Sequence, residues 1–177
     1  MSTTTLVDRA PSFRLPGVDG AEHALEDYAA YEALVLIQSC NHCPYVHAWE
    51  GRMKAVQADY GDRSVKLVAI NSNDHLRYPQ DSFEEMVRRA QKQGFNFDYL
   101  WDEDQSLARQ LNSERTPEVF LFDRERKLVY HGAIDDHRDE HAVEEHYLRD
   151  ALDAVLDGRE PPLTHTSPVG CSVKWRQ

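Results

Sequence analysis

The sequence predicts one α/β domain built on a mixed β-sheet, and two observations support this prediction. Apolar runs typical of buried strands alternate with amphipathic helical segments over the first half of the chain, which is the pattern of a parallel sheet covered by helices. Two more strand-like runs then follow each other around a short polar turn, which adds an antiparallel edge. The length of 177 residues suits a single domain.

The predicted strands are short and mostly apolar. Residues 34–38 are a continuous apolar run, as a central strand buried on both faces requires, and residues 65–71 predict a second buried strand. Residues 118–122 and 127–131 lie on either side of a polar turn and predict a hairpin. Residues 10–17, with their two prolines, predict an extended N-terminal segment.

The helices are predicted from apolar residues that recur at steps of three and four. The first lies between Pro44 and Gly61, with the proline in the first turn, where a missing N–H costs little. The second begins after Ser82, which forms a capping box with Glu85, and ends at Gly94. The two remaining helices are predicted over residues 105–111 and 143–155.

The charge of the chain excludes some partners. Its formal net charge is -11, from 31 acidic and 20 basic residues. Such a surface repels nucleic acid and anionic membranes, so neither is expected as a partner. The histidines and acids between His137 and Glu145 predict a solvated acidic face.

The cysteine count points to chemistry rather than to a structural scaffold. No apolar run approaches the roughly 18 residues of a membrane span, and the N-terminus has no apolar signal core. We therefore expect a cytoplasmic protein, in which structural disulfides are rare. Three cysteines in that setting favour redox or metal chemistry, and the odd number leaves one thiol outside any pair.

Cys40-Asn-His-Cys43 is the strongest motif in the chain. It lies between a predicted buried strand and a predicted helix, where the helix N-terminus stabilises a thiolate. Because only Cys171 remains outside the pair, half of a zinc site is a weaker interpretation than a redox pair. We expect Cys40 to be the exposed, low-pKa nucleophile and Cys43 to be the resolving thiol that releases the product.

Other residues near the motif carry supporting hypotheses. A cationic His42 beside Cys40 would stabilise the thiolate, whereas an exposed loop histidine would have no effect. The run Cys40, Cys43 and His47 also offers a less favoured metal site. No metal and no cofactor is expected. Thr116-Pro117 opens a predicted strand, and its backbone would face the sulfurs and pair with an extended partner chain if the bond were cis.

These residues resemble the thioredoxin-like superfamily, specifically its redoxin (AhpC/TSA-like) branch, and most closely a group with Cys-Asn-His-Cys-Pro-Tyr-Val and a Gly-Cys-Ser-x-Lys-Trp ending. The likeness covers about residues 8–157. It implies a thioredoxin-like α/β fold with a central mixed β-sheet flanked by helices, and a cis Pro117 beside the cysteines. It also implies Cys40 as nucleophile and Cys43 as resolving thiol.

The departures from the resemblance leave two questions open. Leu34 replaces the buried acid of thioredoxin, and Glu118 is a candidate substitute as proton acceptor for the resolving thiol. Peroxiredoxins carry a threonine three residues before the reactive cysteine. Cys40 has Ile37 at that place, whereas Cys43 has Cys40 there and is followed by proline, so Cys43 would be the peroxide-reacting thiol in that register.

The expected function is thiol–disulfide exchange on protein or small-molecule disulfides, with an external thiol reductant as the second partner. The alternative is a peroxiredoxin-like thiol peroxidase that reduces hydroperoxides, and a metal chaperone is less favoured. Residues 158–177 are a C-terminal tail that carries Cys171. That thiol is either inert or an accessory thiol, if the tail folds over the redox turn and Trp175 anchors it.

Overall fold

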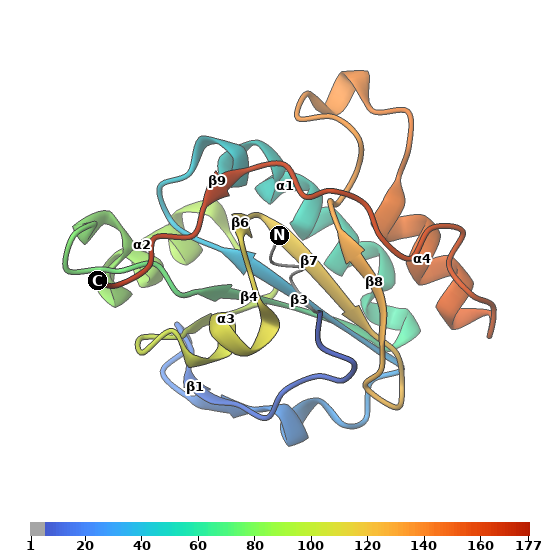
Figure 1. The fold of residues 1–177 in the computed structure, drawn as a ribbon, viewed down its shortest axis with the longest axis horizontal. Coiled ribbons are helices and arrows are strands. Elements are labelled where there is room, and N and C mark those ends of the chain that lie inside the picture. Colours follow the sequence, from blue (N-terminus) through green and yellow to red (C-terminus); the bar gives the residue numbers. More distant parts are fainter. Residues whose placement is uncertain (1–5) are drawn as a thin grey trace.

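A mixed five-stranded β-sheet forms the centre of the computed structural model, which describes residues 6–177 (Figure 1). The first three strands in sheet order are parallel and the last two are antiparallel, because a hairpin follows the crossover connections. The order across the sheet is β5 (Asp98–Trp101), β4 (Val65–Asn71), β3 (Ala33–Ser39), β7 (Glu118–Phe122) and β8 (Leu128–Gly132).

Both faces of the sheet are covered, because alternate residues of the central strand face opposite sides. Val35 and Ile37 of β3 pack with residues of the long helix α1 (Pro44–Tyr60) and of α4 (Tyr147–Leu156). Leu34 and Leu36 pack on the other side with residues of α3 (Ser106–Leu111) and of the N-terminal segment. Such burial on both sides explains why β3 is apolar throughout.

Short elements complete the fold. The helix α2 (Phe83–Gln93) begins at Ser82, whose hydroxyl accepts a hydrogen bond from the backbone of Glu85, as the capping pattern predicts. The others are the strands β1 (Arg14–Pro16), β2 (Glu22–Ala24), β6 (Arg115–Thr116) and β9 (Cys171–Ser172), and the 3-10 turns η1 (Leu25–Tyr28), η2 (Gly61–Arg63), η3 (Pro79–Asp81) and η4 (Glu140–Ala142).

The thioredoxin-like architecture predicted from the sequence is confirmed, and one strand of the central sheet and the start of the last helix differ from the prediction. The strand β5 was not predicted, because it spans only four residues at an edge of the sheet and begins with a charged aspartate. The last helix was predicted from residue 143, but α4 begins at Tyr147, because the backbone of the preceding residues first forms the turn η4.

The C-terminal tail runs past the turn between β3 and α1, residues 40–43, and is bonded to it through Cys43 and Cys171. In Figure 1 it runs from the end of α4, past the start of α1, to a C-terminus near α2. Its strand β9 pairs antiparallel with β6, just before Pro117. The tail thus makes ordered backbone contacts with the domain.

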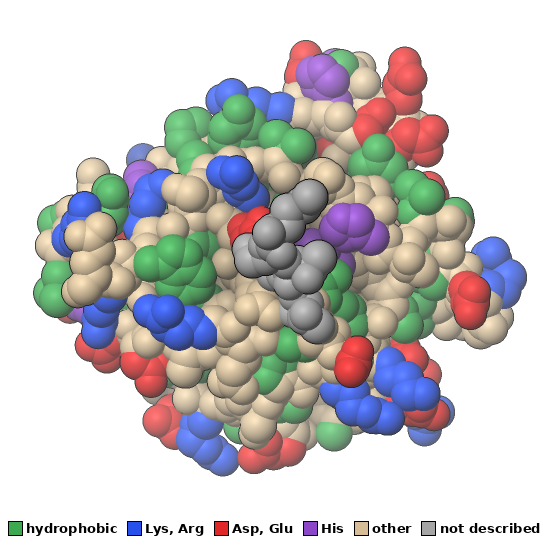
Figure 2. Space-filling model, viewed as in Figure 1, with side chains coloured by type: hydrophobic (Ala, Val, Ile, Leu, Met, Phe, Trp, Pro, Cys, Tyr) green, Lys and Arg blue, Asp and Glu red, His purple; other side chains and the backbone are tan. Residues whose placement is uncertain are grey.

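The acidic residues are concentrated at the surface. Exposed acids gather on the loop that projects between β8 and α4, at the upper right of Figure 2, where Asp139, Glu140, Glu144 and Glu145 lie. This agrees with the solvated acidic face predicted for that segment. Within residues 6–177, no helix is both long and apolar enough to cross a membrane.

The packing of β3 predicts where the fold depends on side-chain volume. We expect Leu36→Ala to lower the free energy of unfolding by about 2–5 kcal/mol, because it leaves a cavity in the core. Leu36 is 0% exposed, whereas Leu76, the matched control, is 72% exposed. Leu76→Ala should change the free energy by less than about 0.5 kcal/mol in urea denaturation. Equal effects of the two substitutions would contradict this account of the core.

Candidate active site

The redox turn, residues 40–43, connects β3 to α1 at the carboxyl ends of the parallel strands. Cys43 is the N-cap residue of α1, with extended backbone angles of φ -76° and ψ 125°, and Pro44 occupies the first helical position. The helix N-terminus carries partial positive charge, which favours an anion at the N-cap. The turn therefore places the Cys43 sulfur where a thiolate is stabilised.

All three cysteines meet at this turn. Cys43 forms a disulfide with Cys171 of the tail, with 6.3 Å between the two Cα atoms, and Cys40 is a free thiol. Cys40, Cys43 and Val46 form a small apolar cluster against which Cys171 packs. The structure thus brings the accessory thiol to the active turn and pairs Cys43 with it rather than with Cys40.

The prediction that Cys40 is an exposed thiol with a lowered pKa is wrong. Its side chain is 1% exposed. Burial, and after it the negative charge of Asp81, raises the pKa of the Cys40 thiol to about 12. An exposed nucleophile was expected at the outer end of the turn, but Cys171 of the tail packs against the cluster that holds Cys40, and Asp81 lies within 4.8 Å of the Cys40 sulfur.

The peptide bond between Thr116 and Pro117 is cis, as the resemblance implied. The Thr116 backbone faces the sulfurs, because its carbonyl oxygen lies 3.5 Å from Cys43 Sγ. Its hydroxyl oxygen lies 3.7 Å from Cys40 Sγ, so the Cys40 thiol donates a weak hydrogen bond to it. Thr116 therefore contacts two of the three sulfur atoms.

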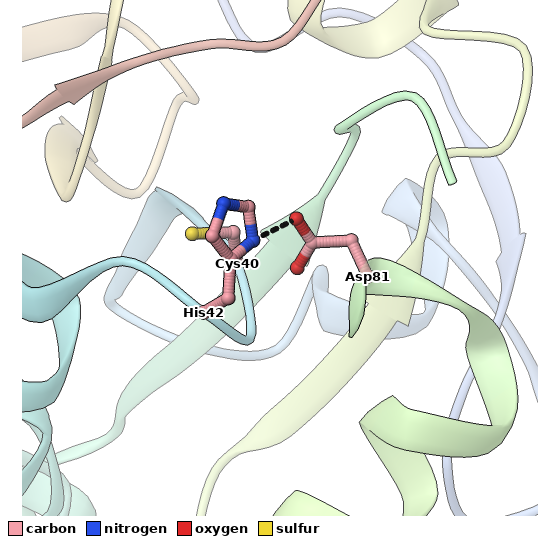
Figure 3. A group of neighbouring side chains, drawn as sticks. All are labelled: Cys40, His42 and Asp81. Carbon is pink, nitrogen blue, oxygen red and sulfur yellow. Dashed lines mark ion pairs between the residues drawn. The ribbon is translucent and has the colours of Figure 1, made fainter. Parts of the chain in front are cut away.

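His42 points towards a buried carboxylate. Figure 3 shows its ring and Asp81 facing each other, and His42 Nδ1 lies 2.5 Å from Asp81 Oδ2. The imidazole also stacks on Tyr78, with 5.7 Å between ring centroids. His42 is thus a packed residue of the turn and not a freely moving loop histidine.

Asp81 was missed by the sequence analysis. It is fully buried, and its Oδ1 accepts a hydrogen bond of 2.7 Å from the backbone N–H of Asn41. Its Oδ2 accepts another, of 2.9 Å, from Asn73. The carboxylate therefore holds the redox turn from a segment that is forty residues further along the chain. The available signal was the polar run after β4, since parallel neighbouring strands end at the same edge of a sheet.

One group of metal-ligating side chains occurs among residues 6–177. The ligand atoms of Cys40, His42 and Asp81 all lie within 4.8 Å of one another. The set predicted from the sequence differs, because His47 Nε2 lies 2.5 Å from the carbonyl oxygen of Asn41 and Cys43 is bonded to Cys171. The observed group combines a soft thiol with borderline and hard ligands, a mixture that suits zinc better than copper.

Glu118 does not supply the missing proton acceptor. Both oxygens of its buried carboxylate are engaged, since Oε1 accepts hydrogen bonds of 2.8 Å from the backbones of Glu114 and Arg115. Its Oε2 lies 2.6 Å from Nε2 of the buried His131, whose Nδ1 lies 3.0 Å from Nδ1 of His165 in the tail. This carboxylate therefore organises the loop before Pro117 and a contact with the tail.

Three comparisons place this geometry among known proteins. The model of the AhpC/TSA family matches residues 6–131. A hypothetical protein from Sinorhizobium meliloti is 35% identical, with a TM-score of 0.91 over 99% of this chain and 97% of that chain. An uncharacterized conserved protein from Geobacillus kaustophilus is 40% identical, with a TM-score of 0.92 over 98% and 94%.

A more distant structure shares the fold alone. A peroxidoxin from Mycobacterium tuberculosis is 18% identical, with a TM-score of 0.64 over 88% of this chain and 96% of that chain. No curated protein matches the sequence.

The burial of Cys40 predicts slow and strongly pH-dependent alkylation of the native oxidised protein. At about pH 8 we expect iodoacetamide to modify Cys40 at least about a hundredfold more slowly than free cysteine, because little thiolate forms far below a pKa of about 12. The rate should keep rising with pH where that of free cysteine, with a pKa of about 8.5, has levelled off.

Asp81→Asn is the matched variant for that measurement. It removes the negative charge that raises the pKa of Cys40 and keeps the shape of the side chain, so alkylation should become faster. Modification of Cys40 in the unaltered protein at the rate of free cysteine would contradict the conclusion that Cys40 is a buried thiol with a raised pKa.

Proposed function

Because the chain belongs to the AhpC/TSA family, whose members share thiol-based redox chemistry, we propose that it is a thiol–disulfide oxidoreductase with Cys43 as its exchanging sulfur. The supporting observation is that Cys43 lies at the centre of three cysteines. It is bonded to Cys171, and it shares an apolar cluster with the free thiol of Cys40. Cys43 also occupies the helix N-terminus, which Cys40 and Cys171 do not.

The reduced protein would act through attack by the Cys43 thiolate on a substrate disulfide. A new bond forms between Cys43 and one substrate sulfur, and the other substrate sulfur leaves as a thiolate. The Cys171 thiolate then attacks Cys43 and releases the first substrate sulfur. Two protein thiols are thereby oxidised to the Cys43–Cys171 disulfide, and one substrate disulfide is reduced to two thiols.

An external thiol reductant would regenerate the dithiol. Cys171 is the more accessible partner of the disulfide, because it is half-buried whereas Cys43 is buried. Attack on Cys171 also expels the Cys43 thiolate, which the helix N-terminus stabilises as a leaving group. A second reductant thiol then frees Cys171. The cytoplasmic location expected from the sequence, with its thiol reductants, remains part of this proposal.

The other two supporting residues would act on the turn. Thr116 contacts the Cys40 and Cys43 sulfurs through its hydroxyl and its carbonyl group. His42 would act through its pairing with Asp81, which in turn binds the backbone N–H of Asn41. In this proposal Cys40 is a neighbouring thiol with a high pKa that exchanges with Cys43 when Cys171 is absent.

A thiol peroxidase is the second candidate, and the disulfide to a distant tail cysteine favours it. Attack by the Cys43 thiolate on a hydroperoxide would transfer one oxygen to sulfur, giving a sulfenic acid and an alcohol, or water from hydrogen peroxide. Attack by Cys171 would then form the same Cys43–Cys171 disulfide and release water. The two functions share their protein end product and differ in the oxidant.

Single substitutions test the roles of the three sulfurs. In a single turnover of the reduced protein with a chromogenic aromatic disulfide, Cys43→Ser should slow the reaction at least about a hundredfold, because it removes the attacking thiolate. Cys171→Ser should leave the rate of the first attack within about threefold and slow the release of the substrate sulfur that is bonded to Cys43. The neighbouring Ser172→Ala is the control for disturbance of the tail.

The rate of oxidation by hydrogen peroxide separates the two candidate functions. Hydrogen peroxide should oxidise the reduced protein no faster than about tenfold above a free thiol if disulfide exchange is the function, and orders of magnitude faster if it is a peroxidase. Full loss of disulfide reduction in Cys40→Ser with retention in Cys43→Ser would contradict the proposed assignment and make Cys40 the nucleophile.

A further inference from the structure

The tail lies beside the redox turn and pairs with the domain as a β-strand, through β9 and β6. Thr116 pairs with Cys171 and Arg115 with Ser172 in antiparallel register. The backbone N–H of Val173 also donates to the carbonyl oxygen of Glu114, at 3.0 Å. We call this surface the tail groove, and its wall is the backbone of residues 114–116.

The groove continues beyond Val173 towards α3. The carbonyl oxygen of Lys174 accepts hydrogen bonds from the Asp74 backbone N–H at 2.8 Å and from Gln105 Nε2 at 2.9 Å. The backbone N–H of Lys174 donates to Asn73 Oδ1 at 2.9 Å. All of these bonds use main-chain atoms of the tail, and any extended polypeptide carries the same atoms in the same places.

Between residues 170 and 174, two tail positions besides the cysteine constrain the side chain. At Gly170 a Cβ atom would lie 2.1 Å from the carbonyl oxygen of Thr116, so only glycine fits immediately before the cysteine. Val173 is 4% exposed, which requires an apolar residue two places after the cysteine. Ser172 is exposed, and Lys174 Nζ donates to the carbonyl and hydroxyl oxygens of Ser172.

We propose that the tail groove binds an extended segment of a partner protein with the pattern Gly-Cys-x-apolar, and that the tail competes with it for the groove. This inference rests on the proposed function and names its substrate class. A partner cysteine in the place of Cys171 lies against Cys43, where the tail already forms a disulfide. The tail therefore occupies the tail groove in the position that the partner segment would take.

The exchange step balances without a further reactant. The Cys43 thiolate attacks the partner cysteine within its disulfide, forms a Cys43–partner bond and expels the other partner sulfur as a thiolate. Return of the tail then places Cys171 for attack on Cys43, which releases the partner segment. The tail thus prevents stable occupation of the groove by a product.

The probe is a peptide of residues 167–176 whose cysteine forms a mixed disulfide with an aromatic thiol. Attack by Cys43 on the peptide sulfur releases the aromatic thiolate, which is coloured, so its absorbance gives the rate. The protein is the reduced full chain with Cys171→Ser, in which Cys43 is a thiol and the tail is not crosslinked. We expect the unaltered peptide to react with Cys43 at least about tenfold faster than peptides with Gly170→Ala or Val173→Ser, because both changes disturb a fitted position. A peptide with Lys174→Ala is the matched control and should react at the unaltered rate.

Gly170→Ala slows the reaction when it is made in the peptide, but it should speed the reaction of the unaltered peptide when it is made in the protein. Gly170→Ala added to the full chain with Cys171→Ser expels the tail from the groove, so the unaltered peptide should react about threefold faster or more. Circular dichroism checks that this variant is folded. If it is not, the peptide series on the chain with Cys171→Ser alone decides the question.

Two failures are distinguishable. Equal rates for all four peptides, while a small aromatic disulfide reacts readily with Cys43, would overturn the groove and leave the proposed function in place. A Cys43 that reacts with neither the peptides nor the small disulfide would overturn the proposed function and this inference with it.

Discussion

The close approach of the tail backbone to Thr116 is the contact on which the site depends. Glycine at position 170 permits it, because any Cβ there would collide with the Thr116 carbonyl oxygen. The resulting strand pairing brings Cys171, which lies 128 residues after Cys43 in the chain, into bonding contact with it. Without this pairing the tail thiol would diffuse at the end of a flexible segment, and intramolecular exchange would lose its effective concentration.

The same contact explains the different properties of the two cysteines in the motif. Cys43 sits at the helix N-terminus and is joined to the half-buried Cys171, so its sulfur is reached through the tail. Cys40 is enclosed, and a buried carboxylate, Asp81, lies beside it, which opposes a second negative charge. Both sulfurs are buried, so the proposed exchange at Cys43 rests on its place at the helix N-terminus and on the neighbouring carboxylate that, with burial, raises the pKa of the Cys40 thiol.

Much of the fold was predictable from local patterns, whereas the pairing of the sulfurs was not. Continuous apolar runs identified β3 and β4, and the capping residue Ser82 located α2, because these signals depend on neighbouring residues. The motif placed its two cysteines at the correct turn. The burial of Cys40 and the carboxylate of Asp81 arise from contacts between segments distant in sequence, and spacing within a motif carries no information about them.

Disulfide mapping tests the central claim most directly. The native protein would be oxidised by one equivalent of a mild disulfide, its remaining thiol blocked, and its proteolytic peptides identified by mass spectrometry. The account predicts a peptide pair that links Cys43 to Cys171 and a blocked Cys40. A predominant link between Cys40 and Cys43, with Cys171 blocked, would contradict it.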